Sequence, residues 1–137
     1  MTYQIIRNAI KCPDGTILES KHRHDYKAHI DRVTTERYAV DGGLDYFRGS
    51  INKVQPEYLH VTTEDPFEVQ REAFTWGSYG KNGDEPKHYI KLMDMQTEHI
   101  KAILDTQWQI EGTYVEKLFQ QELEYRKDTN RKANLEV

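Results

Sequence analysis

The hydrophobic pattern of the first twenty residues is that of short β-strands separated by a turn. Residues 3–12, YQIIRNAIKC, are rich in β-branched side chains, and residues 17–20, ILES, resume the extended pattern. Between them lies PDGT at 13–16, where proline presets φ and glycine tolerates a positive φ. This order of positions predicts a β-hairpin.

A second hairpin is predicted over residues 26–40, YKAHIDRVTTERYAV, with its bend between His29 and Thr35. The glycine pair in DGG at 41–43 closes this segment as a turn. The next stretch, LDYFRGSI at 44–51, fits either a short helix or a strand. The pattern therefore predicts a small antiparallel sheet in the first third of the chain.

The rest of the chain combines extended segments with helix signals. YLHVT at 58–62 is extended, and a helix is predicted over 64–74, with Asp65 as its cap and Pro66 at its first position. The glycine-rich stretch WGSYGKNGDEP at 76–86 is predicted as a loop, and an extended segment follows it.

Two further helices are predicted near the end of the sequence. The first covers residues 97–107 with Thr97 as its cap. The second covers residues 113–127, where Thr113 and Glu116 have the spacing of a capping box. The polar tail that follows is predicted to fray.

These elements together predict an α+β fold, in which an N-terminal antiparallel sheet packs with about three C-terminal helices. The length of 137 residues suits a single domain, with a β-rich hairpin module at 1–49 and a mainly helical part at 50–137. Nine tyrosines give the chain rings that serve cores and binding surfaces alike.

The net charge and composition argue against several classes of protein. The net charge is −4, without the basic stripe that a duplex nucleic-acid binder uses to displace counterions. One cysteine cannot form an intramolecular disulfide, and no apolar run approaches the roughly 20 residues of a membrane helix. The N-terminus lacks the pattern of a signal peptide, so we expect a cytoplasmic protein with no membrane partner.

Histidines crowd into ESKHRHDYKAHID at 19–31, downstream of the single cysteine. Cys12, His22, His24 and His29 are residue types that bind zinc. His22 and His24 alternate by two, so they would share one face of a strand, but no C-x-x-C or H-x-x-x-H spacing accompanies them. We therefore predict no metal site and interpret the stretch as the polar edge of a sheet.

A catalytic alternative pairs His24 with Asp25 or Glu19, because a carboxylate can orient an imidazole for general base work. Adjacent residues on a strand point to opposite faces, which weakens the pair with Asp25. No serine lies in an elbow motif, and Cys12 has no clear activating partner. We predict no catalytic residues and keep a hydrolase that uses the His22 and His24 region as an alternative.

The loop at 76–86 is the strongest candidate for ligand binding. Its three glycines allow close approach of the backbone, and Trp76 and Tyr79 offer rings that stack on a base. Lys81 or Lys87 offers a charge for a phosphate. The loop has neither Walker spacing nor the strand–turn–helix context of a Rossmann turn. The alternative is a plain connector whose rings cover the core.

Two arginines add charge to this predicted site. Arg48 follows the paired glycines of AVDGGLDYFRGS, where an ion pair with Asp45 in a tight turn is the simpler interpretation. Arg126 lies four residues after Glu122, a spacing typical of a solvated helix pair. The predicted ligand-binding residues are Trp76, Tyr79, Lys81, Arg48, Arg126 and His24.

The segment NAIKCPDGTILESKHRHDYKAH…YAVDGGLDYFR resembles an uncharacterised family of small proteins from tailed phages and prophages. Members of that family look like C-x-x-C-G-x-x-I-E-S, then H-D-[FY], a second cysteine knuckle and V-D-G-G-x-[DY]-Y-L-R, which is a small zinc-ribbon pattern. The overlap covers roughly residues 5–49. The resemblance implies a phage origin and a small module of β-hairpins.

The chain departs from the metal-binding part of that pattern. Cys12 matches the first knuckle cysteine, but the cysteine expected next to Gly15 is absent. KAHIDRVTTERY stands where the second knuckle would be and contains no cysteine. We therefore expect degenerate ribbon-like hairpins that have lost their zinc.

For function we expect a non-enzymatic phage accessory protein that counteracts host defence in the cytoplasm of the infected bacterium. It would bind and sequester a nucleotide-like immune signal without a cofactor, as a homo-oligomer whose subunit boundaries form pockets. One alternative is inhibition of a host defence enzyme by protein–protein contact through the tyrosine-rich surface. The other is hydrolysis of a nucleotide signal.

Overall fold

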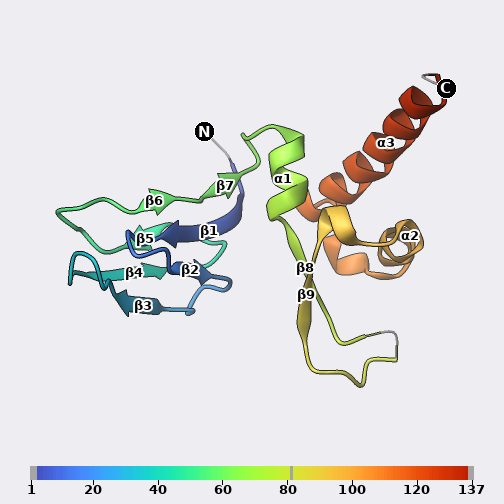
Figure 1. The fold of residues 1–137 in the computed structure, drawn as a ribbon. Coiled ribbons are helices and arrows are strands. Elements are labelled where there is room, and N and C mark those ends of the chain that lie inside the picture. The colour runs from blue at the N-terminus through green and yellow to red at the C-terminus, as the bar shows by residue number, and fades with distance from the viewer. Residues whose placement is uncertain (1–2, 81, 136–137) are drawn as a thin grey trace. The chain divides into compact units, whose positions relative to one another are not determined.

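The computed structural model describes residues 3–80 and 82–135, with side chains up to Asn130. The chain divides into two compact units, Met1–Ala73 and Phe74–Val137. Small antiparallel sheets and three α-helices lie within the described residues, so the predicted α+β class is confirmed (Figure 1). Strands continue to Thr62, so the β-rich part extends beyond the predicted limit at residue 49.

The first sheet of the N-terminal unit is built around β1 (Ile5–Lys11). It pairs antiparallel with β2 (Ile17–Ser20) through the predicted turn at 13–16, where Gly15 has a φ of +94°. On its other side β1 pairs first with β6 (Glu57–Tyr58) and then with β7 (Val61–Thr62). The first hairpin is therefore as predicted.

The second sheet has the order β3–β4–β5, with β3 (Lys27–Ile30), β4 (Arg37–Asp41) and β5 (Arg48–Gly49). The predicted hairpin at 26–40 is confirmed, and the ambiguous stretch at 44–51 contains the short strand β5. Apolar side chains from both sheets form one buried cluster. Its members are Ile10, Cys12, Leu18, Tyr38 and Val40.

The buried side-chain amide of Asn8 donates hydrogen bonds to the backbone of the turn at 41–46. Asn8 is 1% exposed, and its Nδ2 lies 2.9 Å from the carbonyl oxygen of Asp41 and 3.0 Å from that of Gly43. Gly43 has a φ of +54°, and a Cβ there would lie 2.1 Å from the carbonyl carbon of His22. Only glycine fits this position, which explains the DGG motif.

Two aspartates join the turn after β1 to the turn after β3, and we call them the aspartate clasp. Asp31 Oδ1 accepts the backbone N–H of Asp14 at 2.7 Å. Asp14 Oδ2 in return accepts the N–H of Arg32 at 2.9 Å and lies 2.8 Å from His29 Nε2. The clasp therefore adds reciprocal bonds between two turns to the local bonds that each aspartate makes within its own turn.

The N-terminal unit ends with α1 (Phe67–Ala73), which contacts β7 and β1 (Figure 1). Pro66 directly precedes the helix, and its carbonyl oxygen accepts the N–H groups of Val69 and Gln70, so the helix begins one residue after the predicted first position. The carboxylate of Asp65 accepts the N–H of Thr62, so it closes the turn that leads into the helix.

The C-terminal unit begins with a hairpin of β8 (Thr75–Ser78) and β9 (His88–Lys91), followed by α2 (Thr97–Thr106) and α3 (Tyr114–Leu135). The predicted start of the loop at residue 76 is wrong, because residues 76–78 belong to β8 and pair with β9. The polar tail, predicted to fray, continues α3 to Leu135.

An apolar core holds these elements together within the C-terminal unit. Phe74 and Trp76 both meet the ring of Phe119 edge-on, with centroid distances of 5.8 and 5.5 Å. The buried apolar side chains of this unit are Phe74, Leu92, Met95, Ile100, Ile103, Ile110, Leu118 and Phe119.

Glu122 and Arg126 form a buried ion pair, so the predicted solvated helix pair is wrong. Glu122 is fully buried, and Arg126 Nε lies 2.6 Å from its Oε2. The guanidinium also donates to Thr97 Oγ1 at 2.8 Å and to the carbonyl oxygen of Met95 at 2.7 Å. The i, i+4 spacing predicts the ion pair. It does not predict that Met95 and Thr97, just before and at the start of α2, contact the guanidinium.

The predicted cap of α2 is also wrong. Gln96 occupies the N-cap position, and no side chain caps the helix there. The Thr97 hydroxyl instead accepts a hydrogen bond from Arg126. At the start of α3, the Thr113 hydroxyl donates to Ile110 and Glu116 accepts the N–H of Gly112, which differs from the predicted capping box.

Candidate ligand-binding cleft

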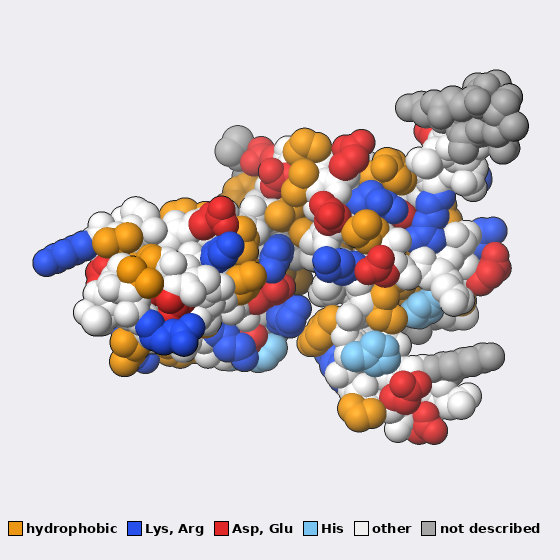
Figure 2. All heavy atoms as spheres, viewed as in Figure 1, with side chains coloured by type: hydrophobic (Ala, Val, Ile, Leu, Met, Phe, Trp, Pro, Cys, Tyr) orange, Lys and Arg blue, Asp and Glu red, His pale blue; other side chains and the backbone are white. Residues whose placement is uncertain are grey.

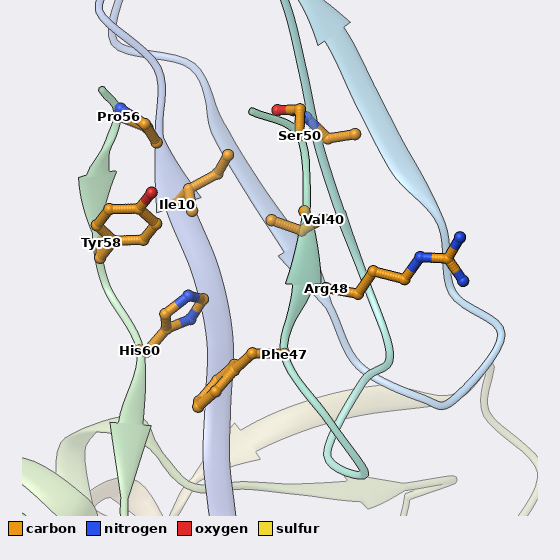
Figure 3. A pocket seen from close by; sticks show the side chains of 10 residues that line it. Ile10, Val40, Phe47, Arg48, Ser50, Pro56, Tyr58 and His60 are labelled. Atoms are coloured by element: carbon orange, nitrogen blue, oxygen red, sulfur yellow. The ribbon is translucent and has the colours of Figure 1, made fainter. Parts of the chain in front are cut away.

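Two hollows adjoin β5 within the N-terminal unit, and we call them together the Arg48 cleft. One is about 230 Å³ and lies between β5 and the β6–β7 segment (Figure 3). The other is about 300 Å³ and is also lined by Tyr26 and Arg37. Both share one wall, formed by Ala39, Val40, Arg48, Gly49 and Ser50.

A row of three rings lines the first hollow. Phe47 and His60 lie with centroids 4.1 Å apart and planes tilted by 34°, and Tyr58 and His60 have centroids 5.5 Å apart. Figure 3 shows Tyr58 and His60 on the β6–β7 segment, and Phe47 extending toward His60 from the β5 side. This side of the cleft is suited to a flat, mostly apolar ring.

His60 is held in a defined protonation state. Its Nδ1 accepts the backbone N–H of Ala9 at 3.3 Å, so Nδ1 carries no proton. Burial lowers the pKa of the imidazole because the charged form loses solvation. The ring is therefore neutral at pH 7, with its proton on Nε2.

The second hollow carries the positive charge of the cleft. The Arg37 guanidinium lies over the ring of Tyr26, 5.8 Å from its centroid. Asp41 and Arg48 are cross-strand neighbours on β4 and β5. In Figure 3 the Arg48 side chain extends away from the row of rings. Two guanidiniums against one carboxylate favour an anionic group.

The chemistry of the cleft favours binding over covalent catalysis. Ser50 is the hydroxyl residue of the shared wall, and its Oγ donates to Asn52 Oδ1 at 2.6 Å while accepting the N–H of Ala39 at 3.0 Å. Its hydrogen bonds are thus used to hold β4 and β5 in place. A nucleophile needs instead a base within reach of its proton.

The predicted His22 and His24 pair does not lie on a strand. Both side chains are exposed and lie in the turn between β2 and β3, so the predicted shared strand face is wrong. The Asp25 carboxylate accepts the N–H of Lys21 at 2.9 Å and lies 2.9 Å from Lys27 Nζ. Its contacts therefore order this turn.

The four residues considered as zinc ligands have separate structural roles. Cys12 is 2% exposed within the apolar cluster, and burial raises the pKa of its thiol. His29 binds Asp14 in the aspartate clasp. Among residues 3–80 and 82–135 no three His, Cys, Asp or Glu side chains are placed to hold a metal ion.

The rings of the predicted Trp76 loop do not come together in one ligand site. Trp76 is half-buried against Phe119, and Tyr79 is 54% exposed. Lys81 lies outside the described residues. A groove of about 780 Å³ adjoins this hairpin, and its charged lining includes three carboxylates. Its ionisable lining residues are Glu85, His88, Asp94, Glu98 and His99.

Of the predicted ligand-binding residues, Arg48 alone lines the Arg48 cleft. Arg126 belongs to the buried ion pair of the C-terminal unit, and His24 lies in an exposed turn. Sequence reasoning missed the three rings of the first hollow. The alternation of Tyr58 and His60 in an extended segment was the available signal, since such residues share a face.

Comparison with protein-family models, curated proteins and solved structures finds no match to this chain. The resemblance to the phage family therefore stays a prediction. Among the described residues no helix is long and apolar enough to cross a bilayer. On the face in Figure 2, basic and acidic side chains are interspersed across the described residues.

Proposed function

We propose that this protein is a non-enzymatic binding protein that takes up a nucleotide-like ligand in the Arg48 cleft. The ring of the ligand would lie in the first hollow against Phe47, Tyr58 and His60. Its anionic group would meet the guanidiniums of Arg37 and Arg48. This is the combination of apolar surface and few convergent polar groups that is typical of ligand sites.

The single observation that carries the proposal is the position of Arg48. Its strand forms a wall of both hollows, with the aromatic rings on one side of β5 and the Arg48 side chain extending to the other. Each hollow is at or below the roughly 300–1,000 Å³ typical of sites for drug-sized ligands. Together the two hollows suit a ligand of nucleotide size more than an extended polymer.

The acidic groove of the C-terminal unit is a weaker candidate for such a ligand. Its lining contains Glu85, Asp94 and Glu98, and carboxylates disfavour the approach of a phosphate. The Trp76 ring is also engaged with Phe119. We therefore place the nucleotide-like ligand at Arg48 and not at the Trp76 loop.

The biological setting of the proposal rests on the family resemblance of residues 5–49. It is that of a phage accessory protein that sequesters a nucleotide immune signal in the cytoplasm of the infected host. A homo-oligomer fits this role, because the cleft is open to solvent and a second subunit would cover a bound ligand. Light scattering with and without ligand measures the oligomeric state.

Replacing Arg48 with Ala lowers the affinity for ADP-ribose or a cyclic dinucleotide at least about tenfold. The reason is the loss of a charge-assisted hydrogen bond to the anionic group. Isothermal titration calorimetry measures the change. Arg23→Ala is the matched control, because Arg23 is an exposed arginine of the same unit that lines neither hollow.

The alternatives are separated by mass spectrometry of the same samples. The protein is incubated with cyclic nucleotides and ADP-ribose derivatives, then heated, and the supernatant is analysed. Release of the intact compound supports sequestration, and a changed mass supports the hydrolase alternative. Equal affinity of Arg48→Ala and wild type, or failure of all these compounds to bind, contradicts the proposal.

A further inference from the structure

His60 lies where the β1 ladder passes from β6 to β7, and it takes part in that ladder. The carbonyl oxygen of Ala9 accepts the N–H of Leu59 at 3.0 Å, as in an antiparallel sheet. The N–H of Ala9 donates to His60 Nδ1 instead of to a backbone carbonyl. The imidazole therefore substitutes for a backbone acceptor, and the sheet itself fixes its position.

This contact also fixes which nitrogen carries the proton. Nδ1 accepts, so in the neutral ring Nε2 is the donor. Within the described residues no hydrogen bond occupies Nε2. His60 is one of the residues that line the first hollow, and in Figure 3 its ring lies between Tyr58 and Phe47. The hollow thus has a ring N–H donor of defined orientation.

The surroundings of this donor are mostly apolar. Phe47 covers the imidazole at a centroid distance of 4.1 Å, which restrains the ring orientation. Ile10, Val40 and Pro56 line the same hollow. A hydrogen bond made in such surroundings is stronger than one made in water, and an unmatched donor is costly.

We infer that His60 determines the specificity of the cleft for the ligand's base. Its Nε2–H donates to a carbonyl oxygen at the base edge, so a keto base binds more tightly than the matching amino base. An amino group at the same position would place two donors against each other. This inference rests on the proposed function, because it concerns the ligand of that same cleft.

Two ligands that differ at one base edge, in the exocyclic group and in the protonation of the adjacent ring nitrogen, test this inference. Inosine monophosphate carries a carbonyl oxygen where adenosine monophosphate carries an amino group. Wild-type protein binds inosine monophosphate about tenfold more tightly, which corresponds to one matched hydrogen bond. In His60→Phe, which keeps a ring beside Phe47 but has no donor, the two affinities become equal.

The ratio of the two affinities is measured within each variant, so a general loss of stability does not mimic the effect. Nitrogen-15 spectra of the wild-type imidazole add a readout that needs no substitution. The Nε2 signal moves on addition of inosine monophosphate and not of adenosine monophosphate. Uridine and cytidine monophosphates give a second matched pair.

Equal affinities of the wild type for both members of each pair overturn the inference and leave the proposed function standing. An unchanged ratio in His60→Phe overturns it as well. If none of the four nucleotides binds, and ADP-ribose and cyclic dinucleotides do not bind either, both the proposed function and the inference are contradicted. The two failures are therefore distinguishable.

Discussion

Replacing Arg126 with Met lowers the free energy of unfolding of the C-terminal unit by about 3–5 kcal/mol. Met keeps most of the stem volume but removes the positive charge that faces the fully buried Glu122 carboxylate. It also removes the donors to Thr97 and to the carbonyl oxygens of Leu92 and Met95. Urea denaturation followed by circular dichroism measures the change.

Lys127→Ala is the control on the same helix. Lys127 and Glu124 form an ion pair whose side chains are 68% and 69% exposed, so its loss changes stability by less than about 1 kcal/mol. The double variant Glu122→Gln/Arg126→Met recovers part of the loss, because the buried negative charge of Glu122 is also removed. Equal stability of Arg126→Met and wild type would show that the pair is not buried in solution.

Replacing Asp31 with Ala lowers the midpoint of thermal unfolding of the N-terminal unit by at least about 5 °C. Asp31 is 1% exposed and accepts backbone N–H groups from Asp14, Val33 and Thr34. The substitution leaves these donors without their acceptor. Thr35→Ala in the same turn is the control, since the Thr35 hydroxyl bonds only to the adjacent carbonyl among the described contacts.

The aspartate clasp also predicts how stability depends on pH. The bond with His29 and the N–H groups of Arg32 and Thr16 hold the pKa of Asp14 well below its usual range. Burial raises the pKa of Asp31, but the N–H groups of Thr34, Asp14 and Val33 outweigh it, and the pKa is lowered.

Both folded-state pKa values thus lie below the unfolded value of about 3.9. The stabilisation is complete above that pH and is lost as the pH falls below it. Denaturation midpoints measured between pH 2 and 7 fall below about pH 4 in the wild type. In Asp14→Asn/Asp31→Asn this acid-dependent loss is smaller, and an unchanged pH profile would contradict the role of the clasp.

Local backbone chemistry made much of the N-terminal unit predictable. The turns at 13–16 and 41–43 follow from glycines that must take positive φ, here Gly15, Gly42 and Gly43. The strands between them follow from β-branched runs of the right length. Each of these signals lies within a few consecutive residues, so the sequence pattern is sufficient to predict these turns and strands.

Burial and long-range proximity could not be predicted in the same way. The spacing of Glu122 and Arg126 places them on one helix face, but packing against other segments decides whether that face is buried. The glycines around Trp76 predict a loop, although pairing with Ile90 makes Trp76 part of β8. Tertiary contacts overrode local propensity in both cases.

The lining of the Arg48 cleft could not be predicted from the sequence for the same reason. Its walls come from separate segments of the N-terminal unit, and no single stretch of sequence contains its pattern. The charge of Arg48 makes it a candidate from the sequence alone, whereas Phe47 and Tyr58 become neighbours of His60 only through folding. The lining segments are residues 10, 26, 37–41, 47–50 and 56–60.

The most direct test of the cleft is a titration of the nitrogen-15-labelled protein followed by proton–nitrogen correlation spectra. ADP-ribose or inosine monophosphate is added until the signals no longer move. The amide signals of Ala9, Gly49, Ser50 and His60 shift, while those of β8 and β9 stay in place. Shifts confined to β8 and β9, or no shifts at all, would contradict binding at Arg48.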